Sequence, residues 1–496
     1  MRYLVFTALA LVLLVGASSA LPNQVTQTIV ATATGGDVDQ GAENYVYEAG
    51  GEGTIVTQTI DMTAEGTGWV EQDANNDAYY VDGDGAVVTQ SMSMEASGED
   101  VFQNWYWGYG NYADIYGLGT TATQNIWQVA DAENYAGQYA WNGAEQDSGL
   151  ITQGIGQAAV AGGDIDQYAY NDVYSYGDNS AVVQDVSMDA NAGGYAYQDG
   201  YNYADMYAFD TIMVDQSATL NAVAGDWVYQ YFYNENWYAG TNTWSAQDII
   251  MSGTGDDVDQ YLYNYFSSDG AVSESTQVLE AAANSEGYAY QDAYNEALTF
   301  GDDVLGQSIY LNAVAADYAT QYGWNDAYEV GNNLNLGQLS WISGDADYVY
   351  QDAYNYAEFM DSVTVAQDIA FTAISDDVGV DQYGYNEATN YPLYFTGGES
   401  TNLIGQSISA AATGGDISYQ DLWNYADTYW NWDPSTYTVT QNNVATLSAN
   451  DEAYQWMYNW VDWWYSNTGP VAMNINGDAS ADYVDQYHEN WLEVYT

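Results

Sequence analysis

Basic side chains are almost missing from this chain of 496 residues. One Arg and no Lys stand against 70 acidic residues, which gives a formal net charge of −69. Such an excess of negative charge repels nucleic acid and anionic membrane surfaces, so we expect neither as a partner. Cations, Ca²⁺ or other divalent ions among them, are the expected counter-partners.

Cysteine is absent, and the chain has a single His, His488. A disulfide framework is therefore excluded, and the usual ligands and nucleophiles of metal, thiol and phosphate chemistry are missing. His488 stands where other copies of the repeat described below carry a small inner residue, which is more typical of a packing variant than of a catalyst. We expect no catalytic residue, no organic cofactor and no enzymatic activity.

Proline is scarce, with four residues, whereas hydrophobic side chains make up 47% and aromatic side chains 16% of the chain. This composition argues against the disorder that low complexity and high charge could otherwise indicate. Residues 1–20 combine a positive start, an apolar run from Leu4 to Val15, and Ser18 and Ala20 before a cleavage point, which predicts a secretory signal peptide. We expect residues 21–496 to be exported to the cell exterior without a membrane anchor.

A ten-residue segment recurs along the whole chain. "YAYQDAYNEA" at 288–297 returns as "YVYQDAYNYA" at 348–357, and a Gln followed four residues later by an Asn marks about 15 such copies, usually 29 to 32 residues apart. A second Gln precedes most of these pairs by 13 to 15 residues, with a Gly-rich turn such as "TGGD" at 413–416 between the two segments. The clearest pairs are Gln167/Asn171, Gln198/Asn202, Gln230/Asn234, Gln260/Asn264, Gln291/Asn295, Gln321/Asn325, Gln351/Asn355, Gln382/Asn386 and Gln420/Asn424.

Both segments of the repeat alternate with period two, which predicts strands rather than helices. Small or apolar residues share a face with the Gln and the Asn, so these amides are predicted to point inward. Two inward-facing strands joined by a turn form a β-arch. The sequence therefore predicts an all-β fold, a β-arch solenoid of about 15 repeats of about 31 residues in which two parallel sheets face each other, as one repeat domain over 21–496 with amyloid-like cross-β stacking.

Buried amides are costly unless their donors and acceptors are paired. Identical Gln or Asn side chains stacked at about 4.8 Å can pair with the copies above and below, so we expect structural amide ladders. On the outer face, the residue after the second Gln alternates Tyr261, Asp292, Tyr322, Asp352, Tyr383, Asp421. This alternation keeps like charges off adjacent turns and indicates that consecutive repeats are consecutive turns of the stack.

Pairs of Asp separated by one residue are the candidate cation sites. They are Asp37/Asp39, Asp164/Asp166, Asp257/Asp259 and Asp345/Asp347. Two carboxylates on one outer face could bind Ca²⁺. The alternative interpretation is that they are solvated charges that limit lateral aggregation. The many Tyr and Trp likewise have two interpretations, as ladders that stiffen the stack or as a platform for polysaccharide.

No capping segment is evident at either end of the repeat array, which predicts head-to-tail association of copies of the chain. The Gln-x-small-x-Asn-x-Ala pattern resembles the shorter repeats of curlin-type functional amyloids. Across 21–496 the chain resembles amyloid-like archaeal cell-sheath proteins, which are secreted, acidic, rich in Tyr, Asn and Gly, and built of β-arches. This resemblance implies a structural protein of a resistant extracellular sheath; the alternative is a secreted adhesin or surface-layer component that binds polysaccharide or Ca²⁺.

Overall fold

The computed structural model describes residues 24–495 apart from 105–109, 208–210, 240–241, 270–271, 300, 330–333, 360–362, 391–400, 429–435 and 465–468. The predicted signal peptide lies outside the described residues. Every regular element within the described ranges is a β-strand, so none of these residues forms a helix that could span a membrane.

The chain divides into two compact units, Met1–Thr241 and Asn242–Thr496. Unit 1 contains the strands β1 (Gln24–Gly35), β2 (Val38–Val46), β3 (Ala49–Gly50), β4 (Ile55–Gly66), β5 (Trp69–Asp82), β6 (Val87–Gln103), β7 (Asn111–Tyr116), β8 (Thr120–Gln146), β9 (Gly149–Ala161), β10 (Asp164–Ser175), β11 (Ser180–Ala192), β12 (Tyr195–Tyr207), β13 (Thr211–Val223) and β14 (Trp227–Ala239).

Unit 2 contains the strands β15 (Asn242–Gly255), β16 (Asp257–Ser268), β17 (Val272–Ser285), β18 (Tyr288–Thr299), β19 (Asp302–Ala315), β20 (Tyr318–Glu329), β21 (Asn335–Phe359), β22 (Thr364–Asn390), β23 (Thr401–Gly414), β24 (Ile417–Thr428), β25 (Thr436–Ser448), β26 (Glu452–Trp464), β27 (Val471–Ser480) and β28 (Tyr483–Tyr495). The strands β8, β21 and β22 each carry both segments of one repeat, and β6 carries the first segment and the start of the second, which continues in β7.

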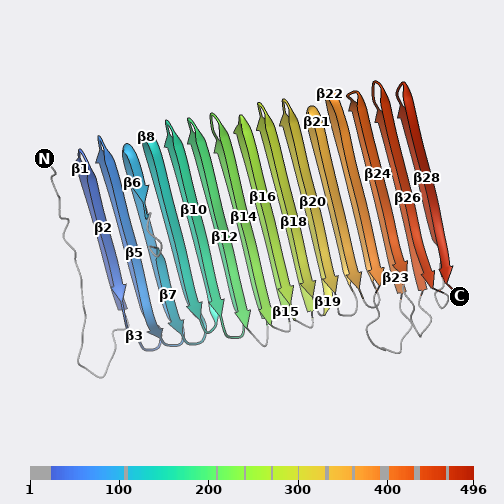
Figure 1. The fold of residues 1–496 in the computed structure, drawn as a ribbon. Coiled ribbons are helices and arrows are strands. Elements are labelled where there is room, and N and C mark those ends of the chain that lie inside the picture. The colour runs from blue at the N-terminus through green and yellow to red at the C-terminus, as the bar shows by residue number, and fades with distance from the viewer. Residues whose placement is uncertain are drawn as a thin grey trace. The chain divides into compact units, whose positions relative to one another are not determined.

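Each unit has two parallel sheets, in which a strand pairs in parallel with its counterparts in the neighbouring repeats of that unit (Figure 1). In unit 1 the first sheet runs β1, β4, β6, β8, β9, β11, β13. The second sheet contains β2, β3, β5, the end of β6, β7, β8, β10, β12 and β14. In unit 2 the first sheet runs β15, β17, β19, β21, β22, β23, β25, β27, and the second runs β16, β18, β20, β21, β22, β24, β26, β28. The predicted β-arch solenoid with two facing parallel sheets is confirmed.

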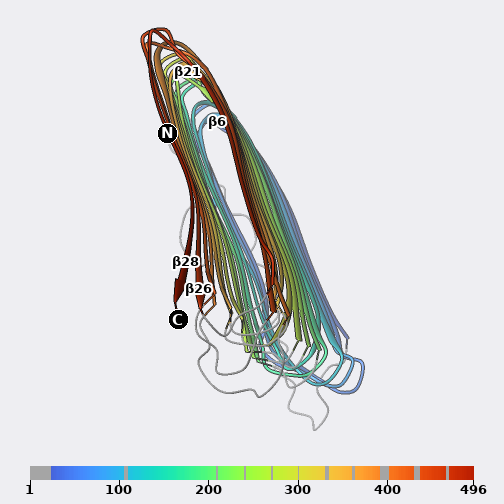
Figure 2. The same ribbon diagram turned by 90° about the vertical axis from the view of Figure 1, so that its right-hand side faces the viewer.

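The period-two pattern places the core as predicted. In β18 the side chains alternate strictly between buried and half-buried along the whole strand. Ala289, Gln291, Ala293, Asn295 and Ala297 are buried within the arch. The two sheets enclose this narrow core between them, and the arch turns gather at one edge of each unit (Figure 2).

The arch turns use glycine where the backbone requires it. Between β23 and β24, Gly414 and Gly415 have φ of 99° and 74°, conformations that L side chains rarely adopt. A Cβ on Gly414 would also lie 1.9 Å from the carbonyl oxygen of Ser375. The turn chemistry predicted from "TGGD" is therefore needed both for the conformation and for the close approach of successive turns.

One repeat departs from the pattern near Gln103. The side chain of Gln103 keeps its place in the Gln column, and its Nε2 donates to Oε1 of Gln72 at 3.0 Å. The Asn four residues later is missing, and Asn111 takes the Asn place instead: it accepts from Asn76 and donates to Asn142, both at 2.9 Å. The Asn column therefore continues across an insertion that hid Asn111 from the sequence pattern.

Candidate functional site: the amide ladders and the outer tyrosine–carboxylate face

The predicted ladder residues are all buried. Along the second sheet, Nε2 of a Gln donates to Oε1 of the Gln one turn earlier, as from Gln321 to Gln291 at 2.8 Å and from Gln351 to Gln321 at 3.0 Å. The Asn column runs in the opposite sense. Nδ2 of Asn295 donates to Oδ1 of Asn325, and Nδ2 of Asn325 to Oδ1 of Asn355, both at 2.9 Å.

Unit 1 contains amide columns of the same kind. Gln198 donates to Gln167 at 2.8 Å, and Asn171 donates to Asn202 at 2.9 Å. Because each primary amide carries a donor and an acceptor, a stack of identical amides satisfies itself without any partner of another kind. This pairing removes the penalty that an isolated buried amide would carry.

The remaining Gln residues of the predicted ladder make the same contact. Gln230 donates to Gln198 at 2.8 Å in unit 1. In unit 2, Gln260 accepts from Gln291, and Gln382 and Gln420 extend the column, all with separations of 2.8 Å. The Gln positions of the second sheet are therefore close to equivalent from turn to turn.

The hydrogen bonds of the predicted Asn positions differ from turn to turn. In unit 1, Asn234 accepts from Asn202 at 3.0 Å. In unit 2, Nδ2 of Asn264 lies within hydrogen-bond distance of three acceptors. These are Oδ1 of Asn295 at 3.1 Å and the backbone carbonyls of Gln247 and Val278, both at 3.3 Å.

Asn386 and Asn424 differ again, because their two repeats are separated by the long connection that includes 391–400. The two residues are 38 positions apart, yet Asn386 accepts from Asn355 and donates to Asn424, both at 2.9 Å. Nδ2 of Asn424 donates to Asn459 at 3.0 Å and also to Oδ1 of Asn443 at 2.8 Å. Asn443 lies in the first sheet, where the preceding turn has Ile408 at the same position. Because Asn443 is polar, it gives the Asn ladder of the second sheet a hydrogen-bond partner on the facing sheet.

The second amide hydrogen joins the two facing sheets, which the sequence pattern did not reveal. Nε2 of Gln307, in the first sheet, donates to the backbone carbonyl of Asp326 in the second sheet at 2.9 Å. In return, Nδ2 of Asn295 in the second sheet donates to the carbonyl of Ser308 in the first at 3.2 Å. Each ladder therefore runs along the stack and also holds the arch closed.

The Gln column of the first sheet stops one turn before the last strand. Met473 in β27 pairs with Gln441 in β25 and replaces the Gln expected at this position. Oε1 of Gln441 is consequently buried without a hydrogen-bond donor. In the second sheet the column continues to the last strand, where Gln486 donates to Gln455 at 2.8 Å.

On the outer face of the second sheet in unit 2, aromatic rings and carboxylates alternate both along and across the strands, an arrangement called a chequerboard below. The column after the Gln alternates as predicted, with Tyr261 beside Asp292 and Asp292 beside Tyr322 on adjacent strands. The column before the Gln has the opposite phase, with Asp259 beside Tyr290. Acidic groups are therefore separated both along a column and across it.

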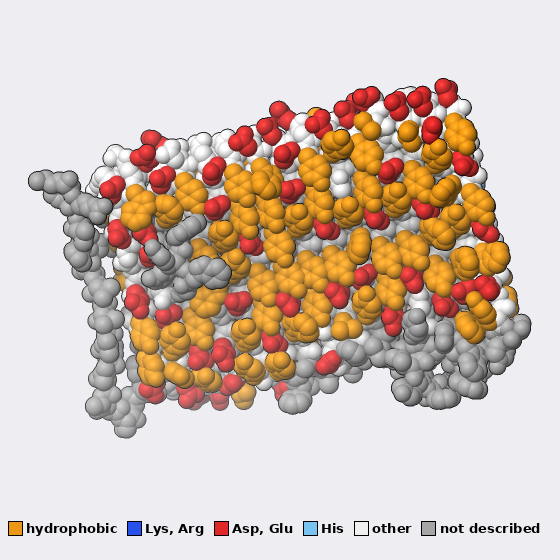
Figure 3. Space-filling model, viewed as in Figure 1, with side chains coloured by type: hydrophobic (Ala, Val, Ile, Leu, Met, Phe, Trp, Pro, Cys, Tyr) orange, Lys and Arg blue, Asp and Glu red, His pale blue; other side chains and the backbone are white. Residues whose placement is uncertain are grey.

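The rings of the two columns form one zigzag chain. Successive ring centroids lie 5.3 to 5.7 Å apart along Tyr261, Tyr290, Tyr322, Tyr350, Tyr383 and Tyr419. Such tilted contacts each add about 0.5 to 1.5 kcal/mol beyond the area they bury. Figure 3 looks onto this face, where rows of hydrophobic side chains are interrupted by single acidic groups.

Tyrosine hydroxyls and Trp N–H groups donate to the carboxylates of the next turn. Tyr294 donates to Asp326 at 2.6 Å and Tyr354 to Glu387 at 2.8 Å in unit 2. In unit 1 the indole of Trp141 donates to Asp172 at 2.8 Å. These diagonal bonds give acidic groups partners in a chain that has no Lys, and they link neighbouring turns through their outer faces.

Burial raises the pKa of many outer carboxyl groups. The pKa of Asp326 rises to about 6 because burial penalises its charged form, although the bond from Tyr294 lowers it in part. Burial likewise raises the pKa of Asp352 and of Asp427 to about 6. These groups change charge near pH 6, far above the usual range of an Asp.

The four predicted Asp pairs do not occupy equivalent places. Asp37, Asp164 and Asp257 each precede a second-sheet Gln by three residues, and their partners Asp39, Asp166 and Asp259 precede it by one. Asp345 instead lies in the first-sheet part of β21, beside Ile374, and Asp347 follows it at the turn. Among the described residues, no group of three or more His, Cys, Asp or Glu is placed to bind a metal ion.

The first Asp of three pairs bonds to the backbone of the next turn. Oδ1 of Asp164 accepts from the backbone N–H of Tyr195 at 3.0 Å. Asp257 does the same with Tyr288 at 3.0 Å, and Asp37 with Trp69 at 3.3 Å. A glycine precedes each donor, and a Cβ on Gly194 would lie 2.6 Å from Asp164 Oδ1. The pairing of an Asp with a Gly one repeat later was a detectable signal that sequence reasoning missed.

His488 lies on the inner side of β28 beside Met457. Its Nε2 is 3.3 Å from Oε1 of Gln455, and burial lowers its pKa. The imidazole therefore contacts the amide column of the second sheet at its last turn.

The first strand of unit 1 and the last strand of unit 2 leave core residues open. In β28, Leu492 and Val494 are 46% and 52% exposed, whereas their neighbours in β26, Val461 and Trp463, are 0% and 9% exposed. In the first strand, Ile29 in β1 is half-buried, whereas Ile60 beside it in β4 is fully buried.

No protein-family model, curated protein or solved structure matches this chain.

Proposed function

We propose that this chain is a non-enzymatic structural protein that assembles head to tail into an extracellular, amyloid-like sheath or tube around the cell. One observation carries the proposal. Inner side chains that are buried in the preceding turn are open to solvent in β28, and the strand pairs only with β26 among the described residues. An edge of this kind templates a further parallel strand.

The direction of the Asn ladder supports a head-to-tail contact. At β28, Asn490 accepts from Asn459 at 2.8 Å, which leaves its Nδ2 directed outward as a donor. At β2, Asn44 donates to Asn76 at 2.9 Å, which leaves its Oδ1 as an acceptor. A donor at one edge and an acceptor at the other continue the ladder when a second copy adds in the same direction, which is a heterologous, propagating contact.

The composition supports an exposed, durable location. With the predicted signal peptide removed, residues 21–496 contain no Lys or Arg, so trypsin-like proteases find no cleavage site. The high negative charge and the absence of basic partners also favour attraction of cations over nucleic acid or anionic lipid. The signal-peptide pattern supports the proposed secretion, and the resemblance described above supports the proposed sheath.

A second candidate is an extracellular adhesin or surface-layer protein that binds polysaccharide or Ca²⁺. It is favoured by exposed rings on the outer faces of both sheets, such as Trp324 in the second sheet at 42% and Trp341 in the first at 46% exposure. The two candidates differ in the state of the chain. A protein that remains monomeric at physiological salt supports the adhesin, whereas filaments or sheets support the structural role.

The test places a positive charge on the open edge. Gln486→Lys puts an ammonium group into the inner column of β28, where a second copy would have to bury it, so we expect loss of filament growth by light scattering and electron microscopy. Tyr487→Lys is the matched control, because it makes the same charge change on the outer face of the same strand. If Gln486→Lys forms filaments as well as Tyr487→Lys does, with unchanged far-UV circular dichroism, the proposal is overturned.

A further inference from the structure

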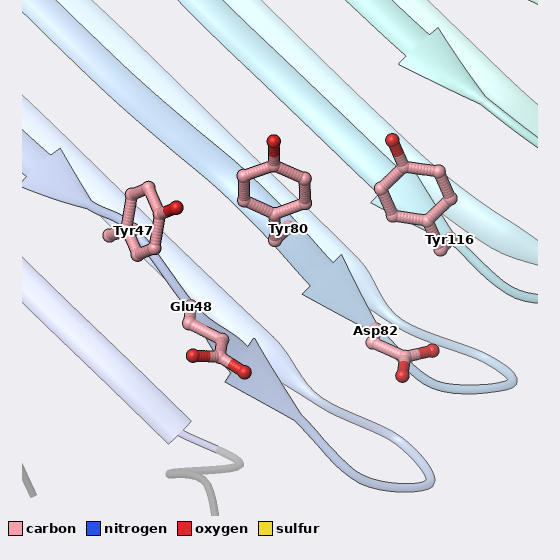
Figure 4. Close-up of a pocket in the computed structure, with 5 residues that line it drawn as sticks. All are labelled: Tyr47, Glu48, Tyr80, Asp82 and Tyr116. Atoms are coloured by element: carbon pink, nitrogen blue, oxygen red, sulfur yellow. The ribbon is translucent and has the colours of Figure 1, made fainter.

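An open cavity in unit 1 is built from aromatic rings and acidic groups that the proposed assembly does not use. Tyr47, Glu48, Tyr80, Asp82 and Tyr116 line this cavity of about 440 Å³ at the end of β5 and β7 (Figure 4). The three tyrosines come from three consecutive turns and are 59%, 47% and 37% exposed, in chain order. The outer face here is a recess rather than a packed chequerboard.

A β-bulge creates the centre of this recess. The register between β5 and β7 shifts between Ala78 and Val81, so that Tyr79 and Tyr80 both lie outside the core. Tyr80 has φ of 55°, a conformation that is uncommon for a bulky residue and costs about 1 to 3 kcal/mol. Bulges that re-aim a side chain are frequent next to binding sites. The chain therefore accepts backbone strain to place one extra ring here.

The rings form a row and the carboxylates lie beside it. The ring centroids of Tyr47 and Tyr80 are 5.4 Å apart with the planes at 67°, and those of Tyr80 and Tyr116 are 6.2 Å apart at 12°. Figure 4 shows Glu48 and Asp82 on the turn side of the row, on consecutive turns. The row thus offers ring faces along one side and negative charges along the other.

The turns below the row hold its backbone in place. Gly83 and Gly117, with φ of 138° and 137°, follow Asp82 and Tyr116. A Cβ on Gly83 would lie 2.1 Å from the carbonyl oxygen of Gly51, and a Cβ on Gly117 2.6 Å from that of Gly83. The turns therefore stack in direct contact, which fixes the spacing of the residues above them.

The chemistry of this lining selects an organic cation. Glu48 and Asp82 are exposed and have no basic partner among the described residues, and the only Arg of the chain is Arg2. Ammonium groups bind both to carboxylates and to the faces of Tyr rings. A hard metal ion would need several converging oxygen ligands, which two carboxylates on separate turns do not supply.

We propose that this recess of unit 1 binds a protonated linear polyamine, which lies along the Tyr47–Tyr80–Tyr116 row with its ammonium groups beside Glu48 and Asp82. The extended row suits a chain-like cation with several charges better than a single compact one. The polymethylene segments between the charges would pack against the rings.

The experiment is equilibrium dialysis of the full chain against spermidine at about 0.15 M NaCl, where diffuse attraction to the acidic surface is screened beyond about 8 Å. We expect one saturable site per chain above a weak, non-saturating uptake. Tyr80→Gly should weaken this site about 3- to 30-fold through loss of the ring–cation contact. Glycine suits the φ of Tyr80, so this variant is expected to fold, which circular dichroism checks.

Two controls make the result decisive. Asp82→Asn should weaken the site, whereas Asp317→Asn, which removes one exposed carboxylate from unit 2, should leave it unchanged. Equal effects of both changes, no effect of Tyr80→Gly, or equal binding of neutral cellotriose would overturn the proposal. Spermidine binding should persist in Gln486→Lys, so that failure of assembly and failure of this site are distinguished.

Discussion

The inner and outer faces of the second sheet obey opposite rules of repetition. Inside, the same amide recurs on every turn, as with Gln291, Gln321 and Gln351, and each copy pairs with the next. Outside, the neighbouring positions alternate as Asp292, Tyr322 and Asp352. An amide complements a copy of itself because it has both a donor and an acceptor, whereas a carboxylate repels a copy of itself and needs a donor of another kind.

The two faces also differ in how they respond to solution conditions. The inner amides do not titrate, so the ladders keep the same hydrogen bonds at any moderate pH. On the outer face, burial raises the pKa of Asp326 and of Asp352 to about 6. Changes to the inner face should therefore destabilise the fold at every pH, and changes to the outer face should do so in a pH-dependent way.

The largest expected effect comes from interrupting an inner ladder. Asn325→Leu removes the acceptor of Asn295 Nδ2 in the ladder and so leaves one buried amide N–H unpaired. It also removes one of the two donors to Oδ1 of Asn355, which keeps the hydroxyl of Ser340 at 3.1 Å. We expect the free energy of unfolding to fall by about 3 to 5 kcal/mol, measured by urea titration followed by circular dichroism.

Asn312→Leu is the control for that ladder change, because Asn312 is exposed on the outer face of β19. The same substitution should there change stability by about 0.5 kcal/mol or less. Comparable losses at the two positions would contradict the assignment of stability to the inner amides.

A smaller, pH-dependent effect is expected on the outer face. Tyr294→Phe removes the hydroxyl that donates to Asp326 at 2.6 Å, a bond to a charged group above pH 6. The loss should be about 2 kcal/mol at pH 8 and about half of that at pH 4.5, where Asp326 is protonated. Thermal and urea unfolding at both pH values measure the difference.

The raised pKa of Asp326 decides how its contribution to stability changes with pH in the unmodified protein. Asp326 contributes stability that is fully present below the ordinary value of 3.8 and is lost as the pH rises through about 6. Tyr294→Phe should steepen this loss, because it removes a bond that lowers the pKa. Tyr318→Phe is the control: its ring is 52% exposed, and the change should leave the free energy of unfolding the same at pH 4.5 and at pH 8. A loss of equal size at both pH values for Tyr294→Phe would contradict the mechanism.

The smallest expected effect is an increase in stability. Met473→Gln restores the amide missing from the end of the first-sheet column and supplies a donor to the unpaired Oε1 of Gln441. We expect a stabilisation of about 0.5 to 1.5 kcal/mol together with a shorter lag in assembly. Met473→Leu is the matched apolar control and should neither stabilise the fold nor shorten the lag in assembly. A stabilisation by Leu would indicate that packing, and not hydrogen bonding, is responsible.

Much of the fold follows from two regularities that the sequence displays openly. The period of two assigns Ala293 and Asn295 to the core and Tyr294 to the outer face. The spacing of the Gln residues sets the register, because a shift by one residue would turn the whole inner face outward. The alternation from Tyr261 to Asp421 then orders the turns.

Other features involve atoms that meet across the arch or diagonally between turns, where no simple spacing applies. The bonds from Gln307 to the carbonyl of Asp326 and from Asn424 to Asn443 depend on the distance between the two sheets. The continuation of the Asn column through Asn111 depends on how an insertion is accommodated. A bulge at Tyr80 adds one residue to one strand, and period-two reasoning cannot anticipate it.

The sequence by itself determined which side chains face inward and that like residues stack on like, since pleat and repeat length are properties of a single chain. Only the tertiary structure decided where the second amide hydrogens bind, how Tyr hydroxyls reach the acids of the next turn, and that three tyrosines open into a recess. These outcomes depend on separations of a few ångströms between strands, and hydrogen bonds form or fail over that range.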